Sequence, residues 1–294
     1  MWRKSKPYLM IMPVLTLILL LFVGGLGLGI LQSLGYFPVL GQLELSLRAY
    51  ETLIEQDQFW ESLSLSLRTA FLSTLLSSFL GLGAALLTLL WKKEERSVGW
   101  VWQRLFLFPL LIPHLVVAYL MVLLFMQSGW ISRVIYSLGI IEDMTQFPVL
   151  IHEPMGWGII FAYVWKETPF VALLLFPVIQ RIRDSWQEAA RMLGANTWMF
   201  LKEIVIPLLM PAWLAASFIV FAFTFTAFEM PYLLGVTYPE MISVYGFRLY
   251  TGSLSERPEA MALNVIITVI SVGLGYAAYR LSKRWSLREG KGWA

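Results

Sequence analysis

Cysteine is absent from this 294-residue chain, and charged side chains are scarce. Without cysteine there is no disulfide, no thiolate metal site and no cysteine nucleophile. Charged residues make up 14% of the chain, whereas a typical soluble domain carries about 25%. Hydrophobic residues make up 58%, and the mean hydropathy is +0.69. Too few polar side chains are present to cover a water-soluble fold of this size. The composition therefore argues against a cytosolic enzyme and predicts an integral membrane protein.

Six apolar runs are each long enough to cross a bilayer, which takes about 20 residues for a hydrocarbon core of roughly 30 Å. They cover residues 8–31, 66–90, 105–126, 156–179, 208–232 and 260–281. The first run is too long for a signal peptide and no small-residue cleavage site follows it, so we expect an uncleaved first helix. Gly81 and Gly83 predict a close helix approach in the second run. The sequence therefore predicts an all-α membrane protein with six transmembrane helices.

The distribution of lysine and arginine predicts the orientation of these helices. With the N-terminus inside, sixteen of the 22 basic residues fall in segments that face the cytoplasm. Cytoplasmic loops of membrane proteins usually carry such an excess. We therefore expect both termini on the cytoplasmic side of the membrane. The net charge of +3 reflects this asymmetry. The basic residues are too dispersed to form a phosphate-binding face, so no nucleic acid partner is expected.

Acidic residues follow the opposite distribution, and eleven of the 19 fall in the expected outer segments, five of them within residues 32–65. One interpretation is that they merely complement the basic cytoplasmic side. The other is a docking surface for an external partner, or a funnel for cationic solutes. No segment outside the membrane is long enough to bury an independent core.

The segment between the fourth and fifth runs, residues 181–207, differs from the other loops. Tryptophan, alanine and leucine recur at helical spacing over residues 186–193, which predicts an amphipathic helix. Gly194 then suits the left-handed position at which a helix ends. Asn196 is placed to cap a second short helix, and Pro207 is expected to end that helix and begin the fifth span. The sequence therefore predicts a helix–turn–helix lying along the membrane.

This segment carries a motif of fixed spacing. Glu188-Ala189-Ala190 is followed after three residues by Gly194, and after nine more by Ile204-Val205-Ile206-Pro207. The pattern resembles the EAA signature of binding-protein-dependent ABC importer permeases, E-A-A-x3-G-x9-I-x-L-P. Only Ile206 departs from it, replacing the usual leucine with an apolar residue of equal size.

The resemblance implies the type I ABC importer permease fold, with six transmembrane helices and both termini inside. Residues 1–61 would form an N-terminal transmembrane helix and the first outer loop. Residues 62–283 would form the core, with coupling helices at about 184–205, and residues 284–294 a short basic cytoplasmic tail. Residues 165–170 and 228–235 resemble the polyamine, ferric-iron and thiamine branch, although related sugar permeases have similar stretches. We therefore expect a small polar or cationic solute.

The resemblance also implies how the loop works. In this family the short cytoplasmic helices dock into a separate ATPase, and closure of the ATPase dimer on ATP tilts the helix bundle. The residues expected to couple to the ATPase are Glu188, Ala189, Ala190, Arg191, Gly194 and Ala195. This chain has no G-x4-G-K-[ST] phosphate loop. ATP and Mg²⁺ are therefore expected on the partner, and no cofactor on this chain. The other expected partners are membrane lipid, an extracytoplasmic solute-binding protein and a second permease, either another copy or a sister subunit.

Charges inside a span are costly, and each one is a functional hypothesis. Lys166 and Glu167 lie about halfway along the fourth run. Adjacent helical residues do not face each other, so these two either pair with neighbouring helices and fix the packing, or contact solute or a gate. His114 lies where Pro109 and Pro113 interrupt the third run. It is either a packing residue or, together with freed backbone carbonyls, part of a cavity lining.

Glu229 and Pro231 lie near the outer end of the fifth run. The carboxylate is either a hydrated rim residue beside a helix-breaking turn that closes an outer gate, or a ligand for a cationic solute. The candidates for the solute pathway or gate are His114, Lys166, Glu167, Glu229 and Pro231. No metal site and no catalytic residue is expected, because no facing nucleophile and base are found. An ATP-independent secondary transporter or channel is the alternative function, but it would not explain the motif-bearing loop.

Overall fold

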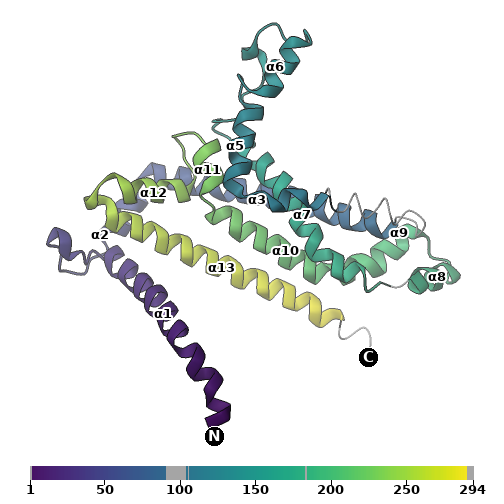
Figure 1. Cartoon of the computed structure of the whole chain (residues 1–294), viewed down its shortest axis with the longest axis horizontal. Coiled ribbons are helices and arrows are strands. Elements are labelled where there is room, and N and C mark those ends of the chain that lie inside the picture. Colours follow the sequence, from purple (N-terminus) through teal and green to yellow (C-terminus); the bar gives the residue numbers. More distant parts are fainter. Residues whose placement is uncertain (1, 91–103, 105, 183, 290–294) are drawn as a thin grey trace. The chain divides into compact units, whose positions relative to one another are not determined.

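The computed structural model describes residues 2–90, 104, 106–182 and 184–289, and this part of the chain is helical apart from its connecting segments (Figure 1). An isolated bridge between Phe37 and Gln42 is the one strand-like pairing in the described part. Several predicted features lie outside the described residues, namely the basic residues Lys92, Lys93 and Arg96 of the first inner loop, Arg183, and residues 290–294 of the tail.

Within the described residues, six helical stretches are long and apolar enough to cross a membrane, which confirms the predicted number. They are Met10–Ser33, Asp57–Leu89, His114–Ser137, Trp157–Ile179, Thr197–Thr226 and Leu254–Arg280. Each overlaps one of the predicted runs. The third and fifth differ most from the prediction, because the third follows a break in the backbone and the fifth begins inside the cytoplasmic loop.

The chain divides into two compact units, and the first comprises Met1–Trp60 and Tyr245–Ile270. Its helical elements, some shared with the second unit, are α1 (Trp2–Ser33), η1 (Pro38–Leu40), α2 (Arg48–Glu55), α3 (Asp57–Leu90), α12 (Ile242–Gly252), η6 (Leu254–Glu256) and α13 (Arg257–Glu289). Two hydrogen bonds of tyrosine hydroxyls join these elements. Ser33 Oγ of α1 lies 2.7 Å from Tyr50 Oη of α2, and Tyr245 Oη of α12 donates to Oε1 of Gln56, just after α2, at 2.5 Å.

The second unit, Glu61–Val244 and Ser271–Ala294, contains all the candidate site residues. Besides parts of α3, α12 and α13 it comprises η3 (Phe108–Leu111), α5 (His114–Phe125), α6 (Trp130–Ser137), η4 (Met144–Gln146), α7 (Trp157–Ile179), α8 (Asp184–Met192), α9 (Thr197–Phe200), the π-helical η5 (Leu201–Val205), α10 (Ile206–Thr226) and α11 (Glu229–Leu234). Helix α7 is the central element and packs against α10, α5, α11 and η3 (Figure 1).

Helices α3 and α7 approach closely at Gly81, as the sequence predicted. A Cβ atom built there would lie 2.7 Å from Val171 Cβ and 2.9 Å from the carbonyl oxygen of Thr168. Gly83 has open space around it, so only one of the two glycines makes the predicted approach. Glycine at position 81 therefore brings the α3 side of the bundle against the middle of α7.

The fifth span corrects two predictions. Pro207 does not end a second short helix, because helical structure continues from Thr197 to Thr226. Proline is tolerated in the first turn of α10, where its missing N–H is not needed, and the π-helical turn Leu201–Val205 immediately before it adjusts the register. The span also ends at Thr226 instead of residue 232, because Ala227 is extended and α11 begins as a separate short helix.

Candidate functional site

The cytoplasmic loop has the predicted turn and cap. Gly194 adopts a φ of +85°, and its N–H donates to the carbonyl of Arg191 at 2.9 Å. The N–H of Ala195 donates to the carbonyl of Ala190, also at 2.9 Å, which completes a Schellman motif at the end of α8. The side-chain oxygen of Asn196 then accepts the N–H of Met199 and caps α9. These bonds satisfy the ends of both helices and fix the angle of the loop.

The residues predicted to couple to the ATPase differ in their burial. Ala190 is buried in an apolar cluster that includes Phe200 and Leu201, so its side chain holds the loop to the bundle. Glu188, Ala189 and Arg191 are exposed. They lie beside a strongly apolar surface, on which Met192 and Leu193 are 90% and 89% exposed and Trp198 is also exposed. An exposed apolar surface of this kind next to charged residues is typical of an interaction site.

The third span is broken immediately before α5. Ile112 is extended, Pro113 follows with a ψ of 145°, and α5 starts at His114. Because Pro113 has no N–H, it cannot bond the carbonyl of Pro109 as a regular helix would require. The carbonyl of Pro109 instead accepts the N–H of Ile112 at 3.3 Å. Lys166 of α7 is a further donor, and its Nζ donates to the carbonyl of Pro109 at 2.9 Å and to that of Ile112 at 2.5 Å.

Glu167 lies against the other side of the same break. Its Oε1 is 3.2 Å from Nε2 of His114, the first residue of α5. The imidazole ring also contacts Phe223 of α10, with the ring centroids 4.7 Å apart. Lys166 and Glu167 are 3% and 6% exposed. The two neighbours therefore do not face each other, as predicted, and each has a partner within the chain.

Glu229 and Pro231 are separate from this buried arrangement. Glu229 is exposed in the first turn of α11, whereas Pro231 is buried. The rings of Phe228 and Tyr232, on either side of them, stack with centroids 4.9 Å apart. The sequence interpretation expected freed backbone carbonyls beside His114, but it missed that Lys166 is their donor, and it missed Phe223, since an apolar ring carries no signal of its own in a hydrophobic span.

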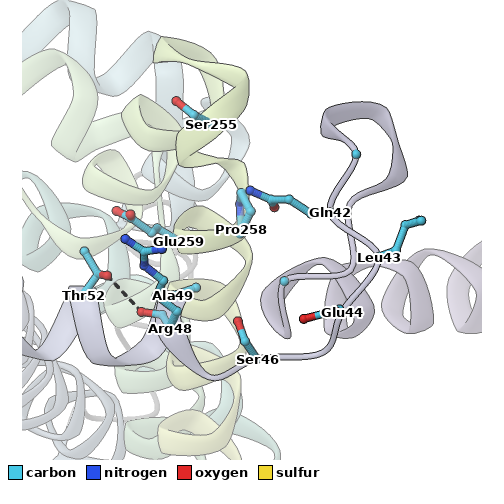
Figure 2. Close-up of a pocket in the computed structure, with 12 residues that line it drawn as sticks. Gln42, Leu43, Glu44, Ser46, Arg48, Ala49, Thr52, Ser255, Pro258 and Glu259 are labelled. Atoms are coloured by element: carbon cyan, nitrogen blue, oxygen red, sulfur yellow. Dashed lines mark hydrogen bonds between the residues drawn. The ribbon is translucent and has the colours of Figure 1, made fainter.

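The first unit contains a large cavity of about 850 Å³ (Figure 2). It lies between the segment that connects α1 to α2 and the beginning of α13. Gln42 extends from that segment toward Pro258, and Arg48 and Glu259 contribute opposite charges to the lining. Thr52 Oγ1 donates to the backbone carbonyl of Arg48 at 2.9 Å and fixes the start of α2. The cavity has a mixed polar and apolar lining and is partly open, unlike the buried arrangement around Lys166.

Comparisons with known proteins show which family and which relatives this chain resembles. Residues 77–286 match the profile of a family described as binding-protein-dependent transport system inner membrane component. The trehalose/maltose transport system permease protein MalF of Thermococcus litoralis is 27% identical over 296 residues, covering 94% of each chain. The glucose import system permease protein GlcT of Saccharolobus solfataricus is 26% identical, covering 82% of this chain and 84% of that protein.

Solved structures show the same fold. A bacterial ABC transporter involved in the import of the acidic polysaccharide alginate aligns with a TM-score of 0.77 and 21% identity, over 96% of this chain and 98% of the matched chain. The methionine transporter MetNI aligns with a TM-score of 0.54 and 15% identity, over 76% and 94%.

These findings confirm the predicted family and correct its finer assignment. The expected nearness to polyamine, ferric-iron and thiamine permeases is not supported, because MalF and GlcT, which match most of the chain, are named for sugars. The short stretches at residues 165–170 and 228–235 were too widely shared to separate the branches. The profile match covers well over half of the chain. The chain therefore belongs to the binding-protein-dependent ABC importer permeases, as a multi-pass inner-membrane transport subunit and not an enzyme.

Proposed function

We propose that this chain forms half of the transmembrane pathway of an ATP-driven importer of a sugar or short oligosaccharide. The observation that carries the proposal is the match to a trehalose/maltose permease along 94% of both chains. A cationic solute is no longer favoured, and the alternative of an ATP-independent transporter or channel is set aside by the family.

The charges inside the membrane support a neutral solute. Lys166 is held by backbone carbonyls and Glu167 by His114, so neither offers a free charge to an ion. Phe223 is partly exposed beside His114, and an aromatic face next to a few polar groups is a common arrangement in sites for small ligands. We assign His114 and Phe223 to the lining of the pathway, and Glu229 with Pro231 to its outer gate.

The cytoplasmic loop is the proposed contact with the ATPase, which would bind ATP and Mg²⁺. Glu188, Ala189 and Arg191 supply its exposed polar and small residues, and Leu193 belongs to its exposed apolar surface. Gly194 and Ala195 would act indirectly, by holding the turn. We propose residues 62–283 as the core, and Ala190 would anchor the loop to the rest of it.

The remaining partners follow from the family and from the predicted orientation, with both termini inside. A second permease, either another copy or a sister subunit, would complete the pathway. A solute-binding protein would dock on the acidic outer side, where the cavity beside Arg48 and Glu259 offers both signs of charge. Complementary charges of this kind chiefly accelerate and orient docking.

Transport by the purified complex tests the proposal. The permease would be reconstituted with its ATPase, second permease and binding protein, and the uptake of a labelled disaccharide, glucose, spermidine and thiamine would be compared. We expect ATP-dependent uptake of a sugar only. Uptake of spermidine or thiamine without any sugar would overturn the assignment.

A matched pair of variants tests the contact with the ATPase. Glu188→Lys reverses an exposed charge on the loop and is expected to abolish co-purification with the ATPase. Glu142→Lys reverses an exposed charge in the expected outer loop and is expected to have no effect. Normal ATPase binding and stimulation by Glu188→Lys would show that the loop is not the docking site.

A further inference from the structure

Two consecutive residues of α7 hold opposite sides of the break in the third span. Lys166 bonds the carbonyls of Pro109 and Ile112, which precede Pro113. Glu167 bonds His114, which follows it. Two adjacent side chains of one helix therefore contact both η3 and α5.

Such an arrangement is costly unless every group in it has a partner. A broken helix leaves carbonyls without donors, and a lone ammonium or carboxylate within a bilayer is strongly unfavourable. Here the ammonium satisfies the freed carbonyls, and the adjacent carboxylate balances its charge. Removing one member would leave a buried charge or a bare carbonyl, so the parts depend on one another.

We propose that Lys166 and Glu167 form a clamp that holds η3 and α5 at a fixed angle, so that the broken third span moves as one body with α7 during transport. They are positioning residues and do not bind the solute. This inference rests on the proposed function only in assuming that the chain cycles between states as a permease. The angle across the break can be measured without any solute.

The clamp also positions His114, which we assign to the lining of the pathway. His114 is bonded to Glu167 and contacts Phe223 of α10. A fixed start of α5 therefore fixes the imidazole against the ring. Loss of the clamp is expected to release α5 from η3 and slow the change between states, with little change in solute binding.

The absence of cysteine from the chain makes a direct distance measurement possible. Spin labels would be placed at Leu111 on η3 and Leu124 on α5, both exposed, in a complex whose other subunits also lack cysteine. We expect a narrow distance distribution in the parent protein and a clearly broader one in Lys166→Met. Lys166→Arg, which keeps the charge and the donors, is expected to restore most of the narrow distribution.

Thr168→Val is the matched control. The Thr168 hydroxyl bonds only the carbonyl of Val164 within its own helix, so its loss is expected to leave the distribution unchanged. If Lys166→Met does not fold, Glu167→Gln replaces it. The glutamine keeps a polar group beside His114 but leaves Lys166 unbalanced, and an intermediate broadening is expected. An unchanged distribution in whichever of these variants folds would overturn the clamp.

Transport kinetics separate the clamp from the other roles. In Lys166→Met we expect the maximal uptake rate to fall about fivefold or more while the half-saturating solute concentration stays within about twofold. A large rise in that concentration with an unchanged distance distribution would instead identify a solute ligand and overturn the proposal. If the parent complex transports no sugar, the proposed function fails, but the distance measurement still decides on the clamp.

Discussion

The clamp around Lys166 and the coupling loop around Glu188 both contain charged residues, but they use them differently. At the clamp, each charge has a partner within the chain and is shielded from its surroundings. At the loop, backbone bonds complete the turn, while the side chains of Glu188 and Leu193 remain exposed. The difference separates a set of charges that is satisfied within one chain from a surface that we propose binds a second protein.

The sharpest test of this comparison uses two adjacent alanines, and we expect it to give the largest effects. Ala190→Asp would place a carboxylate in an apolar cluster, which is expected to cost roughly 3 kcal/mol or more of folding stability. Ala189→Asp would add the same group at an exposed position. It should leave the melting temperature in detergent unchanged, but reduce co-purification of the ATPase by about tenfold or more.

The comparison holds only if Ala190→Asp lowers the melting temperature while Ala189→Asp lowers only the recovery of the ATPase. Thermal unfolding of the permease reports the buried position, and recovery of the ATPase reports the exposed one. Equal loss of stability in both variants would show that α8 is buried on both sides. Full recovery of the ATPase with Ala189→Asp would show that this face of the loop is not the contact.

A second test concerns the packing that supports the clamp, and its effects are intermediate. In Gly81→Ala the new methyl group would meet Val171 and the carbonyl of Thr168, and such overpacking typically costs about 1–3 kcal/mol. In Gly83→Ala the methyl group has open space, and the helix gains up to about 1 kcal/mol in propensity. Melting temperatures should therefore shift in opposite directions. Shifts of the same sign and size would show that α3 and α7 are not in close contact at Gly81.

Local sequence patterns predicted the features that depend on local chemistry. Long apolar runs located the six spans. The Gly194 turn and the Asn196 cap follow from glycine at a left-handed position and from a residue type that favours helix N-caps. The prediction that Pro207 ends a short helix was wrong, because the π-helical turn before it allows the helical structure to continue. Such a turn has no distinctive composition.

Partners that meet only in the folded bundle could not be predicted. His114 and Glu167 are 53 residues apart, and nothing in either span shows that they pair. The donors for the carbonyls of Pro109 and Ile112 were equally hidden, since backbone oxygens are the same at every residue. The prediction of the solute class failed for another reason. The short stretches used to infer it occur in several branches of the family.

The smallest expected effect concerns Asp143, whose charge is exposed, unlike that of Glu167. The backbone N–H of Thr145 donates to its carboxylate at 2.7 Å, and this bond lowers the pKa of Asp143 below its ordinary value of 3.8. Because the folded pKa is depressed, the bond stabilises η4 at pH values above that ordinary value and is lost as the pH falls through the lowered pKa.

Hydrogen exchange of the peptide around Thr145, corrected for intrinsic rates, should therefore increase at acid pH. The matched variant Asp143→Asn should show no such step, because an amide oxygen accepts the bond at every pH. A step that persists in Asp143→Asn would assign the change to another group. The change should stay local and leave the distance between labels at the clamp untouched, since an exposed charge contributes little to stability.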